Sequence, residues 1–266
     1  MGLKHRHNHG RNITSIDSYA YFSGINRWNP DFKVILSLIL IITAVIMNNL
    51  YVSLGIIVIT TYITLYLGRI PIGEYLRLMA IPIAFLILSS IAIIINFSYN
   101  PVGDYYINLN WFYIYCSKEN IYTIINLWGK AFGAISAMYM MSLSTPSSEL
   151  ICVLRRMKVP KVIVELMCLT YRYIFILMDT QLKMKNSAQS RLGYSSYKRS
   201  IYTFGNIASN LFIVSLKKAS ANFDAMEARC YDGSINFLEA DKKVSWGQIL
   251  CSIIVVGTLI IVGIIT

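Results

Sequence analysis

The sequence predicts an all-α fold: a polytopic membrane protein with about five transmembrane helices and a cytoplasmic module of long helices. Three observations carry this prediction. Of the 266 residues, 56% are hydrophobic and only 14% are charged, whereas a soluble domain usually carries about 25% charged residues. The uncharged residues gather in runs long enough to cross a bilayer. The 24 Lys and Arg residues outnumber the 13 Asp and Glu residues, and 15 of these bases lie in residues 144–246.

The membrane spans are predicted from the uncharged runs. Residues 34–67 carry no charged side chain, and at about 1.5 Å per residue they would form roughly 50 Å of helix, which is too long for one crossing. Asn48 and Asn49 favour a turn in the middle of this run, which therefore forms two spans. The five expected spans are residues 34–47, 50–67, 78–97, 121–143 and 246–265.

Lys130 lies inside the fourth expected span, where a charge must either reach the membrane surface or face the protein interior. Its small neighbours Gly129, Ala131, Gly133 and Ala134 favour close packing of helices. Close packing is therefore preferred over a role for Lys130 in a transport path. The segment 98–120, which is rich in Tyr, Trp, Asn and Gly, suits a loop at the membrane interface.

The distribution of bases predicts the orientation. Five bases precede Val34, one lies in residues 98–120 and 15 lie in residues 144–246, so the positive-inside rule places the N-terminus and the long basic segment in the cytoplasm. Cytoplasmic retention accounts for the basic charge, so no nucleic-acid partner is expected. The expected parts are a cytoplasmic N-terminal segment (1–33), four transmembrane helices (34–143), a cytoplasmic module (144–245) and a C-terminal transmembrane helix (246–266).

Metal ligation receives little support. His5, His7 and His9 alternate along the N-terminal tail and could present three imidazoles to a transition metal. The tail has no carboxylate or cysteine to complete such a site, so we expect a flexible tail and no metal site. The five cysteines lack C-x-x-C spacing and suggest neither a disulfide framework nor a zinc site.

The basic segment is predicted to contain three helices. Thr145 is expected to cap a short helix that has Pro146 at its first position and stops before Pro160. Two long helices are expected next, from residue 161 towards 191 and from about 200 to 229. Each ends in an arginine flanked by small residues, with a glycine shortly after. Such an arginine can enter a groove on another protein and bind carboxylates or helix carbonyls with its planar fork. The alternative is a pair of ordinary helix ends, each with a basic last turn.

These segments resemble the transmembrane T component of energy-coupling factor (ECF) transporters, in particular its CbiQ-type branch, which serves cobalt or nickel uptake. The resemblance covers nearly the whole chain. It rests on Ile16 to Tyr21 (IDSYAY), Pro30, Lys33, Thr145-Pro146, Leu154 to Pro160 (LRRMKVP), Glu165, Tyr171 to Ile174 (YRYI), Ser190 to Gly193 (SRLG) and Ala225 to Gly233 (AMEARCYDG).

The resemblance implies a coupling role. The T component links a membrane substrate-capture subunit, of CbiM type with or without a CbiN-type small subunit, to two cytoplasmic ABC-type ATPases. Its long cytoplasmic helices are coupling helices, and an Ala-Arg-Gly motif at the end of each docks on an ATPase. Carried over to this chain, the ATPase-coupling residues are Ala188, Ser190, Arg191, Gly193, Ala228, Arg229, Cys230 and Gly233. Neither arginine is followed by glycine here, so Gly193 and Gly233 are expected to take over the turning of the chain.

The residues themselves agree with a multi-pass subunit of the cell membrane that has no catalytic residues and no cofactor. The chain has no G-x-x-x-x-G-K-[ST] phosphate loop, so ATP hydrolysis is expected on partner chains. A membrane-embedded enzyme is the alternative of another class, but it needs acid/base residues and the chain has no histidine beyond its tail. The expected spans nearly lack metal ligands, which suits a scaffold whose cobalt, nickel or, alternatively, vitamin substrate binds another subunit.

Overall fold

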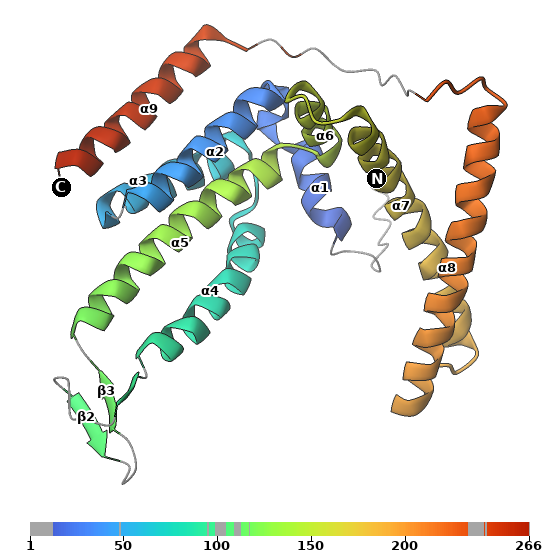
Figure 1. Cartoon of the computed structure of the whole chain (residues 1–266), viewed down its shortest axis with the longest axis horizontal. Coiled ribbons are helices and arrows are strands. Elements are labelled where there is room, and N and C mark those ends of the chain that lie inside the picture. Colours follow the sequence, from blue (N-terminus) through green and yellow to red (C-terminus); the bar gives the residue numbers. More distant parts are fainter. Residues whose placement is uncertain are drawn as a thin grey trace, which may run out of the picture. The chain divides into compact units, whose positions relative to one another are not determined.

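The computed structural model describes residues 13–47, 49–94, 96–98, 105–108, 113–116, 118–233, 242 and 244–265. These residues form two compact units, shown in Figure 1. The membrane unit contains the described residues up to Pro146 together with those from Lys242 onwards. The hairpin unit contains Ser147 to Gly233.

The membrane unit is built from helices, and its helix boundaries follow local capping signals. Its helical elements are α1 (Ile13–Phe22), the 3₁₀ turn η1 (Gly24–Arg27), α2 (Pro30–Ile46), α3 (Leu50–Tyr62), the π-helical turn η2 (Ile63–Leu67), α4 (Ile72–Ile94), α5 (Lys118–Ser144) and α9 (Trp246–Ile265). The side chain of Asn29 accepts hydrogen bonds from the backbone N–H groups of Asp31 and Phe32, which starts α2 before the expected residue 34.

The turn predicted between the first two spans is confirmed. Helix α2 ends at Ile46 and α3 begins at Leu50. The side chain of Asn49 caps α3 by accepting a hydrogen bond of 2.9 Å from the backbone N–H of Tyr51. The amide that disfavours a continued helix therefore also starts the next one.

Helix α5 is the centre of the membrane unit, where it contacts α1, α2, α3 and α4. Its glycines lie at tight contacts, because a Cβ on Gly129 would lie 2.8 Å from Cδ1 of Leu50 and one on Gly133 would lie 3.5 Å from Cβ of Ala44. The close packing predicted around Lys130 is therefore confirmed. Residues from four helices complete the core: Leu36, Leu40, Ala44, Val52, Ile56, Ala137, Met140 and Leu259.

Three of the described helical segments are long and apolar enough to cross a membrane: Leu50–Leu67, Ile72–Ile91 and Trp246–Ile265. The other two expected spans correspond to α2, which has 17 residues, and α5, which has 27. Helix α5 contains Lys130 and hydrogen-bonding residues such as Ser136, whose hydroxyl accepts a 2.9 Å bond from Thr60. A helix that packs against four neighbours presents less surface to lipid, so its own sequence can be more polar. The all-α membrane fold class is confirmed.

The aromatic segment between α4 and α5 contains short strands that the sequence analysis did not predict. They are β1 (Asn96–Ser98), β2 (Tyr105–Asn108) and β3 (Tyr113–Cys116), and they form an antiparallel sheet in the order β1-β3-β2. The aromatic and β-branched residues in β2 and β3 favour strands, whereas the prediction interpreted the aromatic residues only as interface anchors. Trp111, which belongs to this segment, lies outside the described residues.

The hairpin unit consists of α6 (Ser147–Arg156) and two long antiparallel helices, α7 (Lys161–Ser190) and α8 (Tyr197–Glu227), which lie side by side (Figure 1). The three helices predicted in this segment are therefore confirmed within a few residues. The predicted cap of α6 is wrong. Thr145 is buried and its Oγ1 makes no hydrogen bond.

Candidate coupling site at two helix ends

The C-terminal end of α7 places Arg191 just before a sharp reversal of the chain. The backbone N–H of Gly193 donates to the carbonyl of Ala188 over 2.9 Å, and that of Leu192 donates to the carbonyl of Gln189 over 3.1 Å. Leu192 has a φ of 57°. This pair of bonds around a left-handed residue is the Schellman motif, which satisfies the last carbonyls of a helix.

The end of α8 has the same backbone structure. The N–H of Tyr231 donates to the carbonyl of Met226 over 3.1 Å, and that of Cys230 donates to the carbonyl of Glu227 over 2.9 Å. Cys230 also has a φ of 57°. Arg229 therefore occupies at this end the position that Arg191 occupies at the end of α7.

The backbone angles at the two helix ends correct the expectation that Gly193 and Gly233 turn the chain. The residues that adopt the left-handed conformation are Leu192 and Cys230, and each directly follows one of the arginines. Glycine stands at this position in the Ala-Arg-Gly motif that the resemblance implies. Gly193 does not have a positive φ, whereas Gly233 does, at 88°. Each turn therefore holds a non-glycine residue in the left-handed region, which costs about 1 to 2 kcal/mol at each position.

Gly193 is needed for a different reason, which is the tight backbone turn at the end of α7 together with the close approach of Thr203 from α8. A Cβ on this residue would lie 2.8 Å from the carbonyl oxygen of Ala188 and 3.0 Å from Oγ1 of Thr203. The Thr203 hydroxyl donates a hydrogen bond of 2.8 Å to the carbonyl of Gly193. This contact fixes the start of α8 against the first helix end.

Both arginines are available to a partner. Arg191 and Arg229 are exposed, and within the described part of the chain neither guanidinium has a hydrogen-bond or ion-pair partner. Their small neighbours Ser190 and Ala228 are exposed as well. Each helix end thus presents an unpaired planar fork, which can form bidentate bonds with carboxylates or exposed carbonyls.

A tyrosine anchors the second helix end to the beginning of α7. The hydroxyl of Tyr231 donates a hydrogen bond of 3.2 Å to Oε2 of Glu165. Partial burial, this hydrogen bond and the negative charge of Glu165 raise the pKa of Tyr231 above its ordinary value of 10.0. The phenol therefore stays protonated and keeps donating at physiological pH. Both residues lie in the segments that resemble the T component, but no local sequence pattern pairs them.

The two helix ends lie at opposite ends of the hairpin. Tyr231 meets Glu165 at one end, the hydroxyl of Tyr173 reaches the carbonyl of Lys218 between them, and Thr203 meets Gly193 at the other end. At about 1.5 Å per residue, the 30 residues of α7 and the 31 of α8 are each roughly 45 Å long. Arg191 and Arg229 are therefore not brought into one site but lie at opposite ends of the α7–α8 hairpin.

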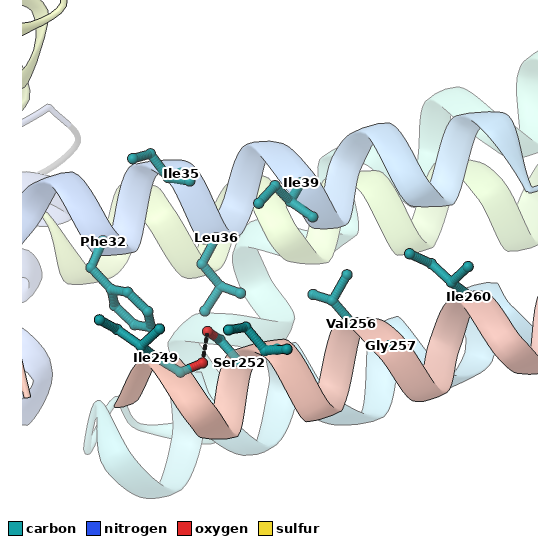
Figure 2. Close-up of a pocket in the computed structure, with 10 residues that line it drawn as sticks. Phe32, Ile35, Leu36, Ile39, Ile249, Ser252, Val256, Gly257 and Ile260 are labelled. Carbon is teal, nitrogen blue, oxygen red and sulfur yellow. Dashed lines mark hydrogen bonds between the residues drawn. The ribbon is translucent and has the colours of Figure 1, made fainter. Parts of the chain in front are cut away.

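The membrane unit contains a groove between α2 and α9, which is drawn in Figure 2. It has a volume of about 440 Å³ and is lined by apolar side chains such as Phe32, Leu36 and Val256. The hydroxyl of Ser252 donates to the carbonyl of Ile249 in its own helix over 2.8 Å. The groove therefore suits lipid or apolar helix surface and offers a cation no charged ligand.

Among the residues that the structure describes, no group of three or more His, Cys, Asp or Glu side chains could hold a metal ion. His5, His7 and His9 lie outside the described residues, so their expected lack of a metal site stays a prediction.

Comparison with known proteins agrees with the resemblance seen in the sequence. The sequence model of the cobalt transport protein family CbiQ matches residues 23–244. The chain is 34% identical to an uncharacterized protein of Methanocaldococcus jannaschii over 235 residues, which cover 88% of this chain and 87% of that protein.

Two further relatives have names that refer to cobalt transport. The cobalt transport protein CbiQ of Salmonella typhimurium is 25% identical over 232 residues, which cover 84% of this chain and all of that protein. A putative fused cobalt transport protein CbiMQ of Methanocorpusculum labreanum is 25% identical over 230 residues, which cover 86% of this chain but only 38% of the fused protein.

Proposed function

The chain belongs to the CbiQ family of cobalt transport proteins, and we propose that it is the transmembrane coupling (T) subunit of an ECF-type ABC importer that takes up cobalt or nickel ions. In this role the chain transmits ATP-driven motion from two cytoplasmic ABC-type ATPases to a membrane substrate-capture subunit. ATP hydrolysis belongs to the partner chains.

The observation that carries the proposal is the pair of matching helix ends. Arg191 and Arg229 each stand before a left-handed residue in the same Schellman motif, and both are exposed and unpaired among the described residues. Two like sites roughly 45 Å apart on one hairpin suit two like partners. Ordinary helix ends need no exposed arginine at the same position of the motif.

The coupling mechanism follows from the way the hairpin is held together. The Tyr231–Glu165 hydrogen bond and the Thr203–Gly193 contact fasten the two long helices to each other near their ends. If an ATPase dimer changes the distance between the two docking sites, the hairpin moves as one body and passes the displacement to the rest of the chain. A hairpin that bent freely would absorb this motion instead.

The capture subunit is of CbiM type, with or without a CbiN-type small subunit. The fused CbiMQ relative supports this pairing, because its name joins a CbiM part to a CbiQ part in one protein. The names of the relatives favour cobalt over a vitamin substrate. The absence of a metal-ligating cluster among the described residues agrees with ion capture on another subunit.

The location follows from hydropathy and charge. The helical segments Leu50–Leu67, Ile72–Ile91 and Trp246–Ile265 suit a multi-pass protein of the cytoplasmic membrane. The excess of bases favours a cytoplasmic position for the N-terminus and for residues 144–245.

Copurification with the ATPases tests the proposal. The chain should be coexpressed with its capture subunit and ATPases as wild type, as Arg191→Ala, as Arg229→Ala and as the double variant. Removing an arginine that pairs with desolvated groups costs about 2 to 5 kcal/mol of interface energy, so each single variant should weaken ATPase retention and the double should abolish retention and uptake. Lysine should rescue poorly, because a point charge cannot reproduce a bidentate fork.

Arg172→Ala supplies the matched control, since Arg172 is an exposed arginine in the body of α7. This variant should retain both ATPases. If the arginines only complement their helix dipoles, each substitution costs about 0.3 to 1 kcal/mol. Near wild-type uptake of radioactive cobalt and nickel by a double variant that inserts normally into the membrane would then refute the docking role.

A further inference from the structure

A basic groove runs between α7 and α8 beside the first helix end. It has a volume of about 760 Å³ and lies entirely within the hairpin unit. Both helices line it, with Lys183 and Arg191 on one side and Asn206, Asn210 and Lys217 on the other.

The charged residues in this groove all have the same sign. Lys183, Arg191 and Lys217 line it together with the amides of Asn206 and Asn210, and no acidic residue does. Lys183 forms an ion pair of 2.7 Å with Asp179, but both side chains are largely exposed, at 75% and 64%. Surface pairs of this kind contribute little to stability, so Lys183 can exchange this partner for a ligand. The groove thus attracts anions and offers them several donors.

The remaining lining is apolar. Met184, Ile207, Ile213 and Val214 line the same cavity as the three bases. A small inorganic anion gains nothing from these side chains, whereas an amphiphile with an anionic head and an apolar body uses both kinds of surface.

Two further features connect the hairpin unit with a lipid surface. The unit directly follows α5 and precedes the apolar helix α9, so the membrane unit flanks it on both sides in sequence. None of the 31 residues of α8 is buried, and its exposed large side chains include Tyr197, Phe204, Phe212 and Phe223. Long helices that combine exposed aromatic residues with Lys and Arg are typical of membrane interfaces.

We propose that the α7–α8 groove binds the phosphate headgroup of an anionic phospholipid, with Lys183 and Lys217 as its cationic donors. This inference goes beyond the coupling role and does not depend on it. Because Arg191 belongs to both the groove and the first helix end, the test avoids this residue and relies on the two lysines.

The test measures binding of phosphatidylglycerol to the full chain in a neutral detergent, by native mass spectrometry and by the shift in Tm. Phosphatidylcholine serves as the zwitterionic comparison. Wild type should bind phosphatidylglycerol selectively. Each base near an anionic lipid surface contributes about fivefold in affinity, so Lys183→Gln with Lys217→Gln should weaken binding about 30-fold. The control pair Lys185→Gln with Lys198→Gln removes the same charge from exposed positions of α7 and just inside α8 that do not line the groove, and should bind like wild type.

Two further measurements distinguish a bound lipid from a soluble phosphate, and a bound lipid from a protein partner. If inorganic phosphate or glycerol phosphate stabilises the chain as strongly as phosphatidylglycerol does, the ligand is a soluble phosphate and the lipid assignment is wrong. Equal effects of the two lysine pairs would show that net charge acts without the groove. If no lipid binds but added ATPase subunits protect Lys183 and Lys217 from acylation, the groove is a protein interface and the proposal fails.

Discussion

The phenol of Tyr231 donates a hydrogen bond of 3.2 Å to Glu165, although 66 residues separate the two in the sequence. The bond joins the residue two places after Arg229 to the second turn of α7. Together with the Thr203–Gly193 contact at the opposite end, it closes the hairpin at both ends. Each helix end is therefore joined to the neighbouring helix by a side-chain hydrogen bond as well as by the covalent chain.

Loss of this bond should loosen the second helix end. Tyr231→Phe keeps the ring and removes only the hydroxyl, so we expect a lower Tm and weaker ATPase retention, but a smaller loss than Arg229→Ala causes. Glu165→Gln should behave similarly, because it removes the charge that strengthens the bond. Tyr202→Phe on α8, where the side chain is 71% exposed, is the control. Equal Tm and retention for Tyr231→Phe and Tyr202→Phe would contradict this prediction.

The same phenol makes a pH-dependent contribution to stability. Because the folded state raises the pKa of Tyr231 above 10.0, the folded chain holds this proton more tightly than the unfolded chain does. The stabilisation is fully present below the unfolded pKa of 10.0 and is lost as the pH rises through the higher folded pKa. The difference in Tm between wild type and Tyr231→Phe should therefore be constant from neutral pH to pH 9 and shrink in more alkaline buffer. A difference that changes between neutral pH and pH 9 would assign the effect to another group.

Glycine in place of either left-handed residue should stabilise the hairpin. Leu192 is 68% exposed and Cys230 is also exposed, so their replacement loses little packing. Relief of the left-handed strain exceeds the entropic cost of glycine, and we expect a gain of about 0.5 to 1 kcal/mol for Leu192→Gly or Cys230→Gly. Ala219→Gly, at an exposed position within α8, should instead lose about 1 kcal/mol. Thermal unfolding in detergent measures all three, and a loss of stability in Leu192→Gly would show that the strain is not present.

Gly193 and Gly205 should respond to alanine in opposite directions. A Cβ at Gly193 meets the carbonyl oxygen of Ala188 at 2.8 Å, whereas one at Gly205, within α8, meets no atom within 4 Å. Gly193→Ala should therefore cost about 1 to 3 kcal/mol, because the added methyl group collides with the backbone at the end of its own helix, and Gly205→Ala should gain up to about 1 kcal/mol from helix propensity. Melting curves of the two variants and of the wild type measure these changes in stability. Stabilisation by both substitutions would mean that the close approach at Gly193 is not required.

The orientation in the membrane can be tested by labelling. Single cysteines at Ser117 and Ser196, placed in a chain without its five native cysteines, should react differently with an impermeant maleimide. Position 196 is exposed at the N-terminus of α8 and should react only after the cells are opened, whereas position 117, outside the described residues, should react in intact cells. Labelling of position 196 from outside would reverse the predicted topology.

The sequence by itself determined the membrane fold class, the family and the approximate positions of most of the long helices. Hydropathy is a local property, so an uncharged run such as residues 246–265 predicts α9 with the bounds that the structure shows. The break between α2 and α3 could also be predicted, because Asn49 acts on the backbone two residues away. The long helices of the hairpin unit were predicted within a few residues for the same reason.

The strands between α4 and α5 could not be separated from an interface loop, because the same aromatic residues suit both. The predicted capping of α6 by Thr145 failed because tertiary packing buries its hydroxyl without a partner. The aromatic residues suit either a strand or an interface loop, and a threonine suits either a helix cap or a buried position. The sequence pattern alone could not choose between these two environments.

Only the tertiary structure decided how the two arginines are presented. The sequence placed glycine shortly after each arginine and suggested that it turns the chain, whereas the backbone turns at Leu192 and Cys230. Gly193 is instead required by the carbonyl oxygen of Ala188, which a Cβ would meet at 2.8 Å, and by Thr203 of the next helix, at 3.0 Å. The pairing of Tyr231 with Glu165 and the groove lined by Lys183 and Lys217 also depend on the register of α7 against α8. That register follows from many weak contacts between residues distant in sequence, which no local pattern records.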